Sequence, residues 1–138
     1  MRTLLIACGN PLRRDDGAGH AVAQRIARAP DREVRSVQQL MPELAADIAR
    51  FDRVVFIDAD AASTRVMIER SGAAAACSPV THAGAHAEIV ALSRALFGFT
   101  GEALLCRVPA RDFSPDAHPG DYSLPFIQQA AEELEKIL

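Results

Sequence analysis

Short apolar segments alternate along this chain with longer stretches in which apolar side chains recur every three or four residues. The apolar segments have the length of strands and span residues 3–8, 33–37, 54–57, 66–69 and 103–108. The longer stretches have the spacing of amphipathic helices and span residues 16–29, 42–51, about 81–96 and 123–138. This alternation predicts an α/β fold with three layers, in which a mostly parallel, twisted sheet of about five strands is covered by helices on both faces.

The length and charge of the chain exclude several classes of protein. Its 138 residues predict a single domain, residues 1–138, and 49% apolar side chains suffice for a packed core. Fifteen Lys and Arg against eighteen Asp and Glu give a net charge of −3. Both signs are scattered, so we expect no nucleic-acid partner and no membrane partner. No apolar stretch approaches the roughly 18 residues that cross a bilayer, and no cleavage signal is visible, so a cytoplasmic protein is expected. Without an evident apolar surface stripe, a monomer is expected.

Polar residues follow the predicted strands at positions that meet along one edge of the sheet. In open parallel sheets, ligands bind beyond the carboxyl ends of the strands. The residues expected at this edge are Asn10, Asp15, Asp16, Asp58, Asp60 and His82. Carboxylates and an imidazole from separate loops suit zinc, nickel or another divalent ion of the first transition row. Three protein ligands would leave one coordination position open for a substrate.

Several polar residues near this edge also have structural interpretations. Either Asp15 or Asp16 could cap the following helix, although two adjacent acids exceed what one cap needs. Asp58 could begin a turn, and Asp60 is expected to stabilise a turn rather than to bind a ligand. Cys8 ends an apolar strand without a neighbouring base in the sequence, so a small buried side chain is expected there rather than a nucleophile. Neither Cys8 nor the other two cysteines form a CxxC pair, and no disulfide or zinc ribbon is predicted.

Two other α/β classes share features with this chain. Gly9, Gly17 and Gly19 follow the first predicted strand, as glycines do in dinucleotide-binding domains, but their spacing is wrong and two acids would meet the pyrophosphate. A phospho-receiver domain also has an acidic pair after its first strand. Here that pair comes seven to eight residues after Cys8. A receiver also carries a lysine after its last strand, whereas this chain has Arg107 within its last predicted strand. Both classes are disfavoured.

The segment from Gly9 to Gly19 carries a specific resemblance. It reads Gly9-Asn10-Pro11-Leu12-Arg13-Arg14-Asp15-Asp16-Gly17-Ala18-Gly19 and resembles the G-N-x-L-x-x-D-[DE]-G-x-G signature of the nickel-iron hydrogenase maturation endopeptidases. The resemblance continues through residues 39–44, 57–59, 81–82 and 87–90, about the first two thirds of the chain. It implies that Asp16, Asp58 and His82 are the metal-contacting and catalytic residues.

The family resemblance implies an endopeptidase that removes a C-terminal extension from a hydrogenase large-subunit precursor after nickel has been inserted. The partner would be that precursor, and the nickel would be carried by it, although another divalent metal ion is an alternative. The residues do not separate metal recognition from metal-assisted hydrolysis. No G-x-S-x-G or HExxH motif is present, so serine and zincin mechanisms have no support.

The chain departs from the family pattern in two places. Ala7 stands where the family usually has glycine, and His86 lies one helical turn after His82 as an alternative ligand. The alternative function is a non-catalytic relative that binds metal or precursor without cleaving it, or a receiver-like signalling domain.

Overall fold

The computed structural model describes residues 1–71 and 83–138, and its centre is a twisted sheet. The described strands are β1 (Thr3–Cys8), β2 (Arg32–Val37), β3 (Arg53–Asp60), β4 (Met67–Arg70) and β5 (Glu102–Pro109). Their order across the sheet is β2-β1-β3-β5-β4. The first four strands in this order pair in parallel, and β4 adds an antiparallel edge. The predicted mostly parallel sheet is confirmed.

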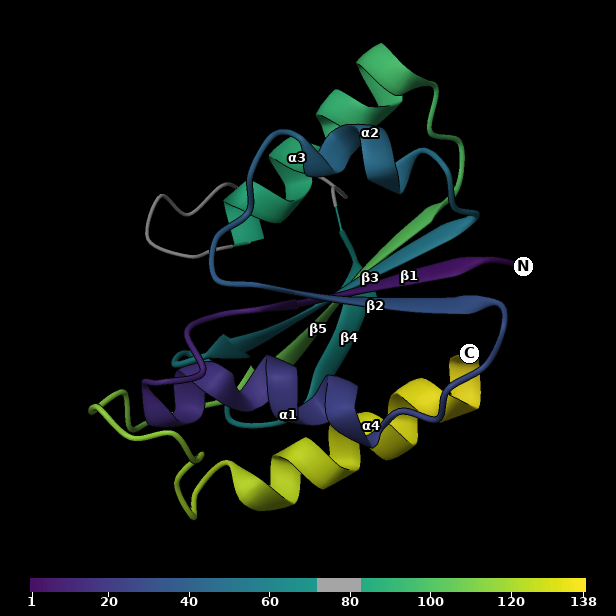
Figure 1. The fold of residues 1–138 in the computed structure, drawn as a ribbon. Helices are drawn as coiled ribbons and strands as arrows, with labels where there is room; N and C mark the ends of the chain where they lie inside the picture. Colours follow the sequence, from purple (N-terminus) through teal and green to yellow (C-terminus); the bar gives the residue numbers. More distant parts are fainter. Residues whose placement is uncertain (72–82) are drawn as a thin grey trace.

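Helices cover both faces of the sheet, as the sequence predicts (Figure 1). The described helices are a 3₁₀ turn η1 (Arg14–Gly17), α1 (Ala18–Arg25), α2 (Leu44–Ile48), α3 (Ala83–Phe97) and α4 (Leu124–Ile137). In Figure 1, α2 and α3 lie above the sheet, and α1 and α4 lie below it. The chain therefore forms the expected three layers. The connection from β1 to β2 runs through α1 on one face, and the connections through α2 and α3 run on the other.

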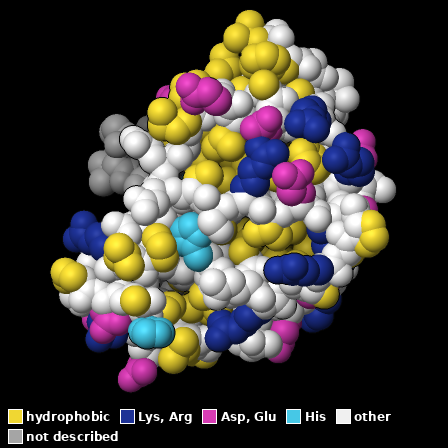
Figure 2. Space-filling view, viewed as in Figure 1, with side chains coloured by type: hydrophobic (Ala, Val, Ile, Leu, Met, Phe, Trp, Pro, Cys, Tyr) yellow, Lys and Arg dark blue, Asp and Glu magenta, His cyan; other side chains and the backbone are white. Residues whose placement is uncertain are grey.

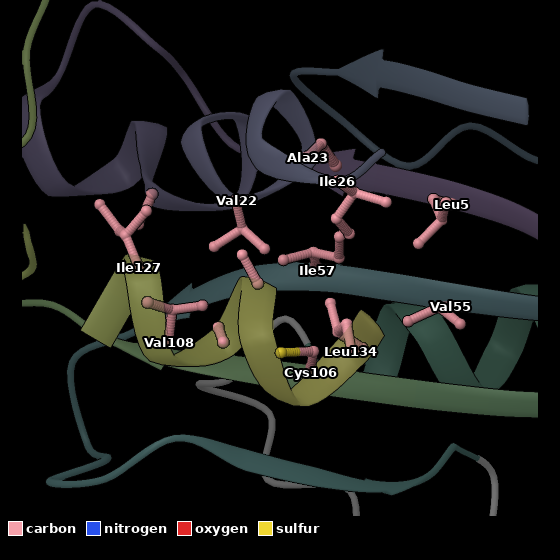
Figure 3. Packing of buried hydrophobic residues seen from close by; sticks show 14 of the residues in the cluster. Leu5, Val22, Ala23, Ile26, Val55, Ile57, Cys106, Val108, Ile127 and Leu134 are labelled. Atoms are coloured by element: carbon pink, nitrogen blue, oxygen red, sulfur yellow. The ribbon is translucent and has the colours of Figure 1, made fainter. Parts of the chain in front are cut away.

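Two apolar clusters fill the space between the layers. One lies between the sheet and α1 and α4, where Val22 and Leu134 pack against alternate strand residues such as Leu5 and Ile57 (Figure 3). The other lies beneath α2 and α3 and includes Phe56 and Ile89. Every residue of β1 is buried, which explains why its sequence is a continuous apolar run rather than an alternating one.

Three elements depart most from their predicted bounds. The first helix begins as η1 and ends at Arg25 rather than at Ala29. The second is shorter than expected because regular α-helix is confined to residues 44–48. β3 continues to Asp60, where Asp58 pairs in register with Arg107 of β5. The predicted end of this strand after Ile57 was wrong, because pairing with β5 extends β3 to Asp60, past the apolar run.

The strand order places a topological switch point between β1 and β3. The chain leaves β1 towards β2 on one side and leaves β3 towards β5 on the other, so the connections diverge at this point. Ligands in open α/β sheets bind at such a switch point, beyond the carboxyl ends of the strands. Cys8 is the last residue of β1, and Asp58 lies near the end of β3. The topology thus selects the neighbourhood of these two residues.

The described surface has no strongly basic face in the view shown. Figure 2 shows Lys and Arg side chains interspersed with Asp and Glu, and apolar side chains gathered at the top over α3. Leu96 and Phe97 are exposed at the end of this helix. Among the described residues, no helix is both long enough and apolar enough to span a membrane.

Candidate active site

Glycines bring the loop after β1 against the strand ends. Gly9 has a φ of +124°, which an L-amino acid with a side chain rarely adopts, and a Cβ atom there would overlap with the backbone oxygen of Asp16. A Cβ atom at Gly19 would overlap with the backbone oxygen of Ile57 in β3. The glycine spacing therefore serves close backbone packing. It folds the loop back so that Asp16 lies beside the start of the same loop.

The Asp16 carboxylate is held by that loop and remains partly exposed. Its Oδ2 accepts a hydrogen bond of 2.8 Å from the backbone N–H of Asn10. The Asn10 side chain in turn accepts a hydrogen bond from the Leu12 N–H at 2.9 Å. Asn10 thus orients the Asp16 carboxylate through its backbone N–H.

Asp15 points away from Asp16 and fastens a distant loop. Its Oδ2 accepts hydrogen bonds from the backbone N–H groups of Arg111 (2.8 Å) and Asp112 (2.9 Å), and its Oδ1 accepts one from Gly120 (2.7 Å). Burial by itself would raise the pKa of Asp15. The backbone donors and the Ser123 hydroxyl outweigh it and hold the pKa below its usual value. The two acids therefore have separate functions, and neither caps α1.

Arg14 reinforces the same connection from a strained backbone. Its φ of +38° is unusual for a residue with a side chain. Its guanidinium forms ion pairs with Asp112 (3.4 Å) and Asp116 (3.1 Å), and its N–H donates to the Asp116 carbonyl at 3.0 Å. The loop after β5 therefore fixes the conformation of η1, the element that carries Asp16.

Asp58 and His86 meet beneath the strand ends. Asp58 is 4% exposed, and its Oδ2 lies 3.6 Å from Nε2 of His86 in α3, which is 1% exposed. The same nitrogen lies 3.7 Å from Sγ of Cys8. The proximity of Cys8 to a histidine could not be read from the sequence, because the two residues are 78 positions apart.

The Cys8 thiol is poorly suited to nucleophilic attack. Burial raises its pKa, and the negative charges of Asp58 and Asp16 raise it further. In a nucleophile–histidine–carboxylate triad the two partners contact different ring nitrogens. Here Cys8 and Asp58 both lie at Nε2 of His86. The expectation that Cys8 is a buried side chain is confirmed.

Two further residues of the rim have structural partners. Asp60 accepts hydrogen bonds from the Ala62 N–H (2.9 Å) and the Ser63 hydroxyl (2.6 Å), as a turn residue does. His20 in α1, which the sequence leaves without a role, has its Nε2 2.7 Å from the Gly9 carbonyl oxygen. His20 thus contacts the loop after β1, and Asp60 holds the turn after β3.

Two of the three predicted ligands lie near the end of β1. A Cβ atom at Gly9 would lie 3.3 Å from Asp16 Oδ1, and Asp58 Oδ2 and Cys8 Sγ both lie close to Nε2 of His86. His82 lies outside the described residues. Within residues 1–71 and 83–138, no three His, Cys, Asp or Glu side chains are grouped to bind a metal ion. The ligand set of Asp16, Asp58 and His82 remains a prediction.

Comparison with known proteins gives full-length structural matches. No protein-family model and no curated protein sequence matches the chain. The hydrogenase maturating endopeptidase HybD of Escherichia coli aligns with a TM-score of 0.82 over 100% of this chain and 92% of its own, at 22% identity. The [NiFe] hydrogenase maturation protease HybD of Thermococcus kodakarensis gives 0.76 over 99% of both chains at 24% identity.

This chain has the fold of the hydrogenase maturation proteases. A third such protease, HycI of Thermococcus kodakarensis, matches with a TM-score of 0.76 over 99% of this chain and 92% of its own, at 21% identity. The maturation-protease fold therefore includes the C-terminal third, where the sequence resemblance stops. That third contributes β5, the loop that binds Asp15, and α4.

Proposed function

We propose that this chain is an endopeptidase that removes a C-terminal extension from a nickel-iron hydrogenase large-subunit precursor after nickel insertion. Two observations together support this proposal: the fold matches the maturation proteases over the full length, and the Gly9–Gly19 motif lies at the topological switch point, where an α/β fold binds its ligand. Its acid Asp16 is partly exposed there, and Asp58, near the end of the adjacent strand β3, is buried.

The donor chemistry of the rim fits a divalent metal ion. Asp16 and Asp58 supply carboxylate oxygens, and a carboxylate as buried as Asp58, at 4% exposure, is stabilised by a nearby positive charge. We propose Asp16, Asp58 and His82 as the metal-contacting residues. A metal ion at such a site polarises a peptide carbonyl or lowers the pKa of a bound water to about 7. In the proposed reaction this ion is the nickel of the precursor and therefore part of the substrate.

Within residues 1–71 and 83–138, the side chains around this rim orient one another, and Cys8 is not suited to act as a nucleophile. Asn10 holds the Asp16 carboxylate through its backbone N–H. Asp15 and Arg14 hold the loop after β5 against η1. Cys8 stays protonated because of burial and the adjacent carboxylates. In the proposed reaction, water attacks the peptide bond and the charge brought by the substrate assists it, so cleavage is conditional on nickel.

Cleavage of a cognate precursor tests the proposal. Purified chain is incubated with nickel-loaded and nickel-free precursor, and mass spectrometry measures the loss of the C-terminal extension. We expect cleavage of the nickel-loaded form alone. Asp16→Asn and Asp58→Asn should abolish it, because each removes a negative charge from the proposed metal contact. Glu88→Gln is the matched control, since Glu88 is an exposed acid on α3.

Three outcomes of this assay separate the alternatives. Equal cleavage of both precursors would refute nickel dependence but leave the endopeptidase intact. No cleavage of either, with nickel-loaded precursor still bound, would support a non-catalytic relative. Wild-type activity in both aspartate variants would show that the assignment of these two residues is wrong.

A further inference from the structure

His86 is fixed in one position by residues of two strands. Its imidazole lies 3.6 Å from Asp58 Oδ2 and 3.7 Å from Cys8 Sγ, both measured from Nε2. Its ring centroid is 4.8 Å from that of Phe56, with the rings tilted by 56°. Phe56 and Asp58 are two residues apart in β3 and so project from the same face of the sheet. The imidazole thus fills the space next to the Asp58 side chain.

His86 is buried more deeply than the partly exposed acid Asp16. It is 1% exposed and packs against Phe56 within the cluster beneath α2 and α3, whereas Asp16 is partly exposed at the rim. A metal ion carried on a protein substrate approaches from the rim. Asp58 contacts His86 through its Oδ2, and the same imidazole nitrogen lies 3.7 Å from Cys8 Sγ at the end of β1.

We propose that His86 is a positioning residue that fixes the direction of the Asp58 carboxylate, and that it is not itself a metal ligand. The proposal rests on the proposed function, because it assigns a partner to one of the proposed metal-contacting residues. Side chains that orient a ligating carboxylate typically change metal affinity or activity by about 10- to 100-fold when they are removed. Through the same contact, His86 joins α3 to the end of β3.

Metal binding by three variants tests this role. His86→Leu removes the polar ring, His86→Gln keeps an amide N–H close to the position of Nε2, and Val90→Ala is the matched control. Val90 lies one helical turn further along α3 and is 2% exposed, so its truncation weakens the packing of α3 without touching Asp58. Urea unfolding of each variant measures its stability, and isothermal titration with Ni²⁺ alone measures its metal affinity.

We expect His86→Leu to bind Ni²⁺ about 10- to 100-fold more weakly than the wild type. His86→Gln should recover part of that loss, and Val90→Ala should keep wild-type affinity despite lower stability. Spin-echo spectroscopy of the Cu²⁺-loaded protein reports bound imidazole directly. The imidazole signal should persist in His86→Gln and disappear in His82→Gln.

Several results would overturn the proposal. Loss of the imidazole signal in His86→Gln would make His86 a direct ligand, and wild-type Ni²⁺ affinity in His86→Leu would remove its positioning role. If His86→Leu does not fold, the comparison of His86→Gln with Val90→Ala decides, and equal affinities would refute the proposal. Absence of Ni²⁺ binding by the wild type would also refute it. Precursor cleavage, measured separately, would still report on the proposed endopeptidase function.

Discussion

Asp15 should contribute more to stability than any exposed acid of this chain, although it adjoins the proposed site. Asp15→Ala removes the acceptor for three backbone N–H groups, those of Arg111, Asp112 and Gly120. Hydrogen bonds to a charged group contribute about 1.5–3 kcal/mol each. Arg111 and Asp112 are exposed, so water replaces part of their loss, whereas the buried Gly120 N–H loses its partner outright. We therefore expect the free energy of unfolding to fall by about 3 kcal/mol.

Urea denaturation followed by circular dichroism measures this loss. Asp121→Ala is the matched control, because Asp121 is an exposed acid next to Gly120. Its removal should change the free energy of unfolding by less than about 0.5 kcal/mol. A loss below about 1 kcal/mol in Asp15→Ala would show that the loop after β5 does not depend on the carboxylate, and the reasoning would fail.

The contribution of Asp15 should also depend on pH. Its pKa is lower in the folded protein than in the unfolded chain, so its stabilising effect is fully present above the ordinary aspartate pKa of about 3.9. The effect is lost as the pH falls through the folded-state pKa. The stability difference between the wild type and Asp15→Asn should therefore shrink as the pH is lowered below about 4. A difference that stays constant down to pH values of about 2 would contradict this pKa shift.

Two further substitutions test the packing of the rim. Gly19→Ala should destabilise the protein by at least about 2 kcal/mol, because its Cβ would overlap with the Ile57 oxygen. Gly84→Ala in α3 should be neutral or stabilising, since a Cβ there meets nothing within 4 Å among the described residues. Thermal unfolding compares the two variants, and equal effects would contradict the close approach of α1 to β3. Iodoacetamide at neutral pH should leave Cys8 unmodified in the native protein and modify it in urea, as peptide mapping by mass spectrometry would detect, because burial and two carboxylates keep it as a thiol. Rapid native modification would restore Cys8 as a candidate nucleophile.

The local elements were predictable where their residues are buried on one or both faces. The apolar runs of β1 and β5 and the apolar spacing of α4 predict these elements directly, because burial imposes a period on the sequence. The end of β3 was not predictable in the same way. Asp58, Ala59 and Asp60 have no strand pattern of their own and are held in the sheet by pairing with β5.

The sequence by itself determined the α/β class and predicted an edge of the sheet for Asp16 and Asp58, since short-range apolar patterns specify the cores of the strands. Tertiary structure alone decided the different roles of the two adjacent acids. Asp15 accepts hydrogen bonds from residues 96 to 105 positions away, and Asp16 accepts one from the backbone N–H of Asn10. It also decided that His86 lies against Asp58 and Cys8. Such contacts join elements far apart in the chain, and only the packing of α3 and of the loop after β5 onto the sheet brings them together.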